Sequence, residues 1–168
     1  MLKILNDLSP FFEDCYRRIN VREYARIRKI SPPTASKLLE HYRKEALLKR
    51  EEDRQFLYYF ADKGSSIFSD LSRIYWNEHL GELSKELSIK FLYPVTILFG
   101  SLSKAEAKMD SDIDIAVFAP SEKKINLKEF EKKLKRNIQL FMFKAREDVK
   151  NKELLNSILN GYILEGKW

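Results

Sequence analysis

Two carboxylates separated by one residue stand at the start of an apolar segment, Asp112-Ile113-Asp114. On a β-strand, alternate side chains project from the same face, so Asp112 and Asp114 would lie side by side. Two such acids on a buried strand repel each other strongly unless a divalent cation lies between them. Hard oxygen ligands suit Mg²⁺. The spacing therefore predicts a Mg²⁺ site at Asp112 and Asp114.

A Gly-Ser pair precedes these acids by ten residues, at the end of the apolar run 96–99. Gly100 permits close approach of the backbone to a ligand, because it has no side chain. Ser101 is expected at the start of a helix over 102–108, where free N–H groups attract phosphate. Together with the Mg²⁺ site, Gly100 and Ser101 predict a site for a nucleoside triphosphate.

The order strand, Gly-Ser, helix, strand with Asp-x-Asp resembles the minimal nucleotidyltransferases of the polymerase-beta-like superfamily, over about residues 93–168. This resemblance implies transfer of a nucleoside monophosphate from an NTP, with ATP the expected donor. It implies that Asp112 and Asp114 are catalytic metal ligands and that Lys104 binds the triphosphate. The family includes antitoxins that adenylylate a partner toxin, so a partner protein is one candidate acceptor.

One position departs from this pattern. Active members usually carry a third carboxylate on the next strand, which is expected here over 138–143, and the matching residue is Gln139. A glutamine amide cannot act as a general base at neutral pH. Glu147 and Asp148 follow this strand and are candidate substitutes. Two functions therefore stay open: a transferase, or a regulator whose domain binds nucleotide or a partner protein without turnover.

The first third of the chain combines a basic segment with a helix-turn-helix pattern. Residues 21–50 contain nine Lys or Arg against three Glu, which equals the net charge of +6 for the whole chain. A helix over 21–30, a turn at Ser31-Pro32-Pro33, a second helix to about 46 and strands at 47–51 and 56–60 follow in order. This resembles a winged helix-turn-helix domain, which implies binding of double-stranded DNA; a dimerisation or docking module is the alternative. The expected DNA-contacting residues are Thr34, Ser36, Lys37, His41, Arg43, Lys44 and Arg54.

We therefore predict an α+β protein in three parts. These are a winged helix-turn-helix domain (1–62), a helical connector (63–92) and a nucleotidyltransferase domain with a small mixed β-sheet (93–168). A helix is expected to begin at Pro10 with Ser9 as its cap, and the last helix is expected over 148–163. The apolar face of the connector predicts a homodimer.

Composition excludes several other classes. A single cysteine excludes an internal disulfide and a cysteine-based zinc finger, and two histidines exclude a His-rich metal site. No apolar run approaches the roughly 18 residues that span a bilayer, and the first residues do not resemble a secretory signal. These features predict a cytoplasmic protein without membrane association.

Overall fold

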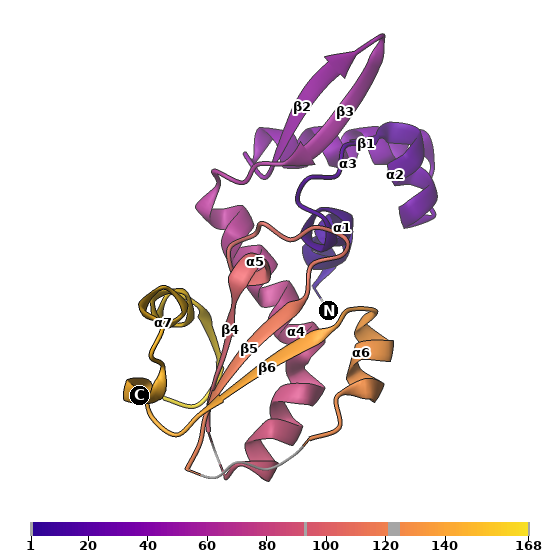
Figure 1. Cartoon of the computed structure of the whole chain (residues 1–168). Coiled ribbons are helices and arrows are strands. Elements are labelled where there is room, and N and C mark those ends of the chain that lie inside the picture. The colour runs from indigo at the N-terminus through magenta and orange to yellow at the C-terminus, as the bar shows by residue number, and fades with distance from the viewer. Residues whose placement is uncertain (1, 93, 121–124, 168) are drawn as a thin grey trace. The chain divides into compact units, whose positions relative to one another are not determined.

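Figure 1 shows the computed structural model, which describes residues 2–92, 94–120 and 125–167. The chain divides into two compact units. The N-terminal unit comprises Met1–Ser72 and Ala105–Met109, and the C-terminal unit comprises Arg73–Lys104 and Asp110–Trp168. The three-part division predicted from the sequence stays a prediction.

The N-terminal unit combines helices with a small antiparallel sheet. Tyr24, Leu39 and Tyr59 are among the largest side chains of its core. The strands lie in the order β1-β3-β2. In chain order the elements are α1 (Lys3–Glu13), β1 (Ile19–Asn20), α2 (Val21–Arg28), α3 (Pro32–Lys44), β2 (Leu48–Asp53) and β3 (Phe56–Ala61).

Local sequence explains where α2 and α3 begin. The side chain of Asn20 accepts a hydrogen bond from the N–H of Glu23, and Ser31 accepts one from Thr34. Both are N-caps, and prolines at the first positions of α3 leave no donor unsatisfied. The helices, the turn between them and the hairpin thus lie where the sequence predicts them.

The first helix begins earlier than predicted. It starts at Lys3 and contains Pro10, instead of starting there. Proline has no N–H to donate to the carbonyl of Asn6. The hydroxyl of Ser9 donates to that carbonyl instead, at 2.8 Å. Ser9 therefore compensates for the proline inside α1 and does not cap the helix.

The C-terminal unit is built on a mixed sheet in the order β6-β5-β4-β7. β5 and β6 are parallel, and the other neighbours are antiparallel. The α+β class is therefore confirmed. Helix α4 (Ser66–Lys90) precedes the sheet, beginning in one unit and continuing in the other. The remaining elements are β4 (Val95–Phe99), α5 (Gly100–Ser103), β5 (Ile113–Phe118), α6 (Lys128–Leu134), β6 (Ile138–Phe143), the 3₁₀ turn η1 (Arg146–Asp148), α7 (Lys152–Leu159) and β7 (Tyr162–Glu165).

Two predicted helices of this unit are shorter than expected. The helix predicted over 102–108 is the single turn α5, which ends because Ala105 has a left-handed backbone conformation. The helix predicted over 148–163 ends at Leu159, and the following residues form β7, which pairs with β4. A side chain at Gly161 would meet the carbonyl of Leu98 at 2.6 Å, so glycine permits the turn into β7.

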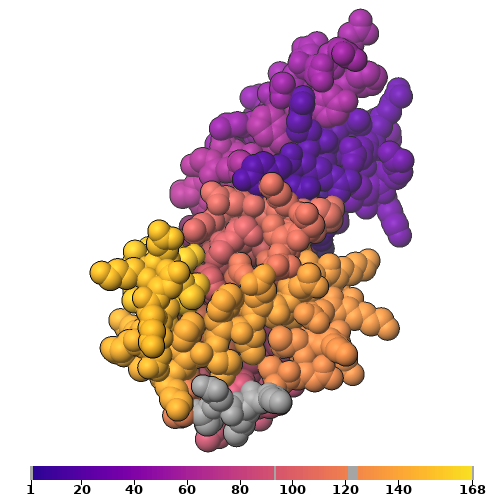
Figure 2. Space-filling view, viewed as in Figure 1, coloured from indigo at the N-terminus to yellow at the C-terminus, as the bar shows by residue number. Residues whose placement is uncertain are grey.

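The core of this unit holds the apolar face of the sheet against the last helix. Ile97, Phe99, Ala116, Phe118 and Ile158 are buried together, with Phe141 and Phe143 packed against them. Aromatic pairs join neighbouring strands, with ring centroids 5.3 Å apart for Phe99–Phe141 and 5.5 Å for Phe118–Phe143. In Figure 2 the C-terminal residues, yellow, border the orange segment that includes β6. This packing fixes the register of β4, β5 and β6.

Candidate functional site

Strand register brings the two predicted motifs together. Phe99, the last residue of β4, is paired with Asp114 of β5, so Gly100 follows directly beside the acids. On the other side, Asp114 is paired with Gln139 of β6. The end of one strand and the starts of two others therefore gather Gly100, Asp114 and Gln139 at one edge of the sheet.

Gly100 lies against the carboxylate of Asp114. Its φ is +72°, a conformation that residues with a side chain rarely adopt. A Cβ at this position would overlap Oδ2 of Asp114 and lie 3.1 Å from its Cγ. Backbone and carboxylate can therefore share this space only because residue 100 is glycine.

Two amide side chains hold the carboxylate of Asp112. Nε2 of Gln139 donates to Oδ2 at 2.6 Å, and Nδ2 of Asn137 donates to Oδ1 at 3.2 Å. Gln139 thus occupies the position beside the acids that the sequence assigns to it. Asn137 was not predicted from the sequence, although it lies two residues before Gln139 and alternation could have placed both on one face.

The loop between α6 and β6 also holds the backbone of the acidic segment. The guanidinium of Arg136 donates to the carbonyl of Ser111 at 2.5 Å, and the N–H of Ile113 donates to the carbonyl of Asn137 at 2.9 Å. Arg136 is 9% exposed and lies over the ring of Trp76, 5.2 Å from its centroid. Arg136 and Asn137 therefore fix the residues on both sides of Asp112.

The electrostatics of the site favour a cation. Burial, and secondarily the neighbouring Asp112 carboxylate, raises the pKa of Asp114. Both causes penalise the ionised form, and a bound cation would oppose both. A bound cation would therefore stabilise the ionised form of Asp114.

The donor set fits a hard divalent cation. It consists of two carboxylates and two amides, and an amide can present its oxygen after a half-turn of the group. Within 2–92, 94–120 and 125–167, no cluster of three His, Cys, Asp or Glu forms a metal site. Asp112 and Asp114 would hold the ion, with Gln139 and Asn137 as neutral neighbours.

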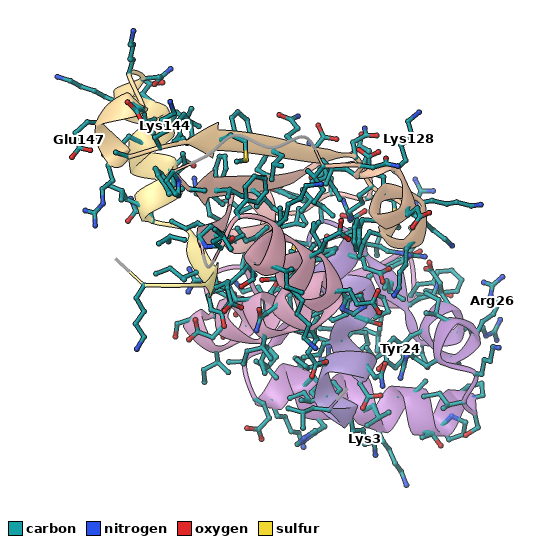
Figure 3. All side chains as sticks on the ribbon, turned by 90° about the horizontal axis from the view of Figure 1, so that it is seen from below. Lys3, Tyr24, Arg26, Lys128, Lys144 and Glu147 are labelled. Atoms are coloured by element: carbon teal, nitrogen blue, oxygen red, sulfur yellow. The ribbon has the colours of Figure 1, made fainter. Side chains whose placement is uncertain are left out.

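The candidate substitutes for a third acid lie at the other end of β6. Asp148 accepts a hydrogen bond from the N–H of Ala145 at 2.9 Å and so closes the turn after the strand. Figure 3 shows Glu147 beside Lys144, at the end of β6 that lies away from Lys128. Six residues of strand span about 20 Å. Glu147 and Asp148 therefore do not complete the site at Gln139.

Ser101 and Lys104 lie on and directly after the short helix α5. Ser101 is half-buried and Lys104 is exposed. The hydroxyl of Ser103 donates to the carbonyl of Gly100 at 2.9 Å, which fixes the turn. Since α5 is one turn long, backbone N–H groups near Ser101 would supply phosphate contacts with little support from a helix dipole.

In the N-terminal unit, the expected DNA-contacting residues divide between two sides of α3. Thr34, Lys37, His41 and Lys44 are exposed and follow one helical face. Ser36 is also exposed, on the side of Glu40. Glu40 forms an ion pair with Arg43 at 2.6 Å and accepts a hydrogen bond from Tyr59 of β3. Arg54 lies in the turn of the β2–β3 hairpin.

Among the residues that the structure describes, no helix has both the length and the apolar character needed to cross a bilayer.

Comparison with known proteins agrees with this geometry. The model of the family described as polymerase beta, nucleotidyltransferase matches residues 79–165, just over half of the chain. The match contains the Gly-Ser turn, both acids and Gln139. No curated protein and no solved structure shows significant similarity to the chain. With its acids, glycine turn and mixed sheet inside the matched range, the chain belongs to the polymerase beta nucleotidyltransferase family.

Proposed function

We propose that the C-terminal unit binds Mg²⁺ with a nucleoside triphosphate, ATP being the expected one, and transfers its nucleoside monophosphate to an acceptor hydroxyl. The observation that supports this most is the close approach of the Gly100 backbone to the carboxylate of Asp114, because it brings the Gly-Ser turn beside an acid of the proposed Mg²⁺ site. Asp112 and Asp114 would hold Mg²⁺, which stabilises charge on the phosphates. Gly100, Ser101 and Lys104 would bind and orient the triphosphate.

A second candidate is supported by Gln139. Its amide donates to Asp112 at 2.6 Å, where a third carboxylate would accept the proton of an attacking hydroxyl. In this version the unit binds the nucleotide and the chain acts as a regulator without turnover. Transfer and binding share the same nucleotide site, so binding is the first property to measure.

For the N-terminal unit we propose a winged helix-turn-helix that binds double-stranded DNA. The succession of α2, α3 and the β2–β3 hairpin supports this, as does the excess of cations over residues 21–50. A homodimer would present two such units to DNA. Alternatively, this unit is a docking module that binds a partner protein. That partner could also be the acceptor of the nucleotide.

Calorimetric titration with Mg²⁺-ATP tests the nucleotide site. We expect binding by the native chain and at least a hundredfold weaker binding by Asp112→Asn/Asp114→Asn. Glu147→Gln, at the other end of β6, is the matched control and should bind normally. Failure of the native chain to bind any of the four common NTPs would contradict the proposal.

Labelled NTP then separates the two versions. Incorporation of label into protein or nucleic acid by the native chain would support transfer. Binding without incorporation, followed by incorporation in Gln139→Asp, would support the regulator and would assign the loss of turnover to Gln139.

A further inference from the structure

The cations of the N-terminal unit fall into two groups. Several of them form ion pairs within the unit, and these pairs reduce the positive charge available to a partner. The paired cations are Arg17 with Glu23 (2.7 Å), Arg18 with Glu51 (3.2 Å), Arg28 with Asp7 (3.3 Å), Arg43 with Glu40 (2.6 Å), Lys49 with Asp62 (2.9 Å) and Arg50 with Glu40 (3.3 Å).

Three of the other cations form a stripe on α2 and directly after it. Arg22, Arg26 and Lys29 are exposed, and no described carboxylate forms an ion pair with them. Arg22 and Arg26 are four residues apart on α2 and so share one helical face, and Lys29 is the left-handed residue that directly follows the helix. From Arg22 to Lys29 the chain extends about 10 Å along the axis. Figure 3 shows Arg26 pointing away from the unit. We call Arg22, Arg26 and Lys29 the α2 stripe.

Nothing on α2 neutralises this stripe. The helix contains one acid, Glu23, and its carboxylate already binds Arg17. Tyr24, on the opposite face, is buried. The helix is thus held to the unit by one side and presents Arg22 and Arg26 on the other, with Lys29 directly after its end.

The β2–β3 hairpin contains as many acids as cations, with Lys49, Arg50 and Arg54 against Glu51, Glu52 and Asp53. Glu51, Glu52 and Asp53 are consecutive and exposed. Arg18 offsets two of them, at 3.2 Å from Glu51 and 3.9 Å from Asp53, and leaves Glu52 without an ion pair among the described residues. Carboxylates at this end of the hairpin would repel phosphates. Arg54 directly follows these three acids, in the turn of the hairpin.

We infer that the α2 stripe, together with the exposed Lys37 and Lys44 of α3, contacts the phosphates of a DNA duplex, and that the β2–β3 hairpin does not. The inference rests on the proposed DNA binding and specifies which elements carry it. Duplex DNA has one phosphate per 3.4 Å of axis on each strand, so a stripe about 10 Å long can face more than one phosphate. The contact is independent of sequence, since phosphates carry no base information.

The experiment is DNA binding as a function of salt, on the full chain. A mixed-sequence duplex of about 30 base pairs is titrated by fluorescence anisotropy between about 50 and 200 mM salt. The stripe variant combines Arg22→Gln, Arg26→Gln and Lys29→Gln. We expect its affinity at low salt to fall on the order of 100-fold, and its salt slope to decrease by about 2 to 3.

Two controls separate position from total charge. Lys128→Gln/Lys132→Gln/Lys135→Gln removes three exposed cations at the same spacing, in and directly after α6, and should change affinity less than about threefold. Arg54→Gln tests the hairpin and should leave the salt slope unchanged. Circular dichroism checks that each variant folds.

The failures are distinguishable. If the native chain does not bind the duplex at low salt, the proposed DNA binding fails and this inference with it. If the native chain binds, but the stripe variant keeps its affinity and slope while Arg54→Gln loses both, the hairpin is the contact surface and only this inference is overturned. Equal losses in the stripe and α6 variants would also overturn it, because total charge alone would then explain binding.

Discussion

In the N-terminal unit, the carboxylate of Asp7 is 5% exposed and is surrounded by donors. The hydroxyl of Tyr42 donates to it at 2.8 Å, and Arg28 lies 3.3 Å away. In the C-terminal unit, the half-buried carboxylate of Asp114 has Asp112 for a neighbour. Among the described residues, none donates a hydrogen bond to it.

This difference separates a carboxylate that has partners within the fold from one that we propose binds a cation. Around Asp7, neighbouring groups remain able to donate hydrogen bonds. Burial, and then the nearby Asp7, raises the pKa of both Tyr24 and Tyr42, so both tyrosines stay neutral donors. At Asp114 burial falls on the acid itself and raises its own pKa. A bound cation would supply there what Tyr42 and Arg28 supply to Asp7.

Removal of the structural acid should have the largest effect on stability. Asp7→Ala leaves the Arg28 guanidinium and the Tyr42 hydroxyl without their acceptor, and we expect the N-terminal unit to lose about 3 kcal/mol. Urea denaturation followed by circular dichroism measures this. Glu45→Ala, an exposed acid at the end of α3, should cost less than about 0.5 kcal/mol. Nucleotide affinity of Asp7→Ala should be unchanged while the unit is folded; a parallel loss would mean that the two acids are not independent.

The glycine turn offers the matching test in the C-terminal unit. Gly100→Ala puts a Cβ into the Asp114 carboxylate at a φ of +72°, and we expect a loss of about 2 kcal/mol. Because the carboxylate must move, nucleotide affinity should fall at least tenfold. Urea denaturation measures the loss of stability, and calorimetric titration measures the nucleotide affinity.

Gly81→Ala is the control for a glycine that no contact requires. A Cβ at Gly81 in α4 meets nothing within 4 Å, so the change should stabilise the helix by about 0.5–1 kcal/mol. If Gly100→Ala behaved in the same way, the close approach to Asp114 would not matter for the site.

Much of this site could be predicted from the sequence because its parts are close in the chain or alternate on strands. Spacing points to Gly100, Asp112 and Asp114, and the resemblance to nucleotidyltransferases points to Gln139. Arg136 could not be predicted, since its role depends on the ring of Trp76, sixty positions earlier in the chain. Strand β7 was missed because its apolar residues also continue the helical pattern of α7; only the turn at Gly161 and pairing with β4 decide between the two.

A smaller effect is expected where the amide is replaced by an acid. In Gln139→Asp, Asp112 loses the donor at 2.6 Å and gains a negative neighbour. Without a cation we expect a loss of about 1 kcal/mol in unfolding free energy, and with Mn²⁺ a recovery of most of it. Denaturation with and without Mn²⁺ measures both.

The isosteric control for this change is Gln139→Glu in a chain that also carries Asp112→Asn. The double variant removes the acid at 112 and adds one at 139, so the net charge of the site is that of the native chain. Its unfolding free energy should therefore respond to Mn²⁺ no more than that of the native chain. Equal stability of Gln139→Asp and the native chain without Mn²⁺ would contradict the role given to the amide.

The smallest effect is the pH dependence that Asp114 gives to stability. Burial and Asp112 raise its pKa in the folded chain above the unfolded value, so folding favours the protonated acid. Its stabilising contribution is therefore present below the unfolded pKa and is lost as the pH rises through the raised folded pKa. Asp114→Asn resembles the protonated form at every pH, so near neutral pH it should unfold at higher urea than the native chain. That difference should vanish as the pH is lowered through the acid range, from about 7 to about 3.

Urea denaturation across this range measures it, with the exposed Asp110→Asn as a control that should show no such trend. Saturating Mg²⁺ should remove the difference near neutral pH, because the ion then offsets the charge that the fold disfavours. A stability difference between the native chain and Asp114→Asn that stays constant over pH would contradict the conclusion that folding disfavours the ionised Asp114 carboxylate.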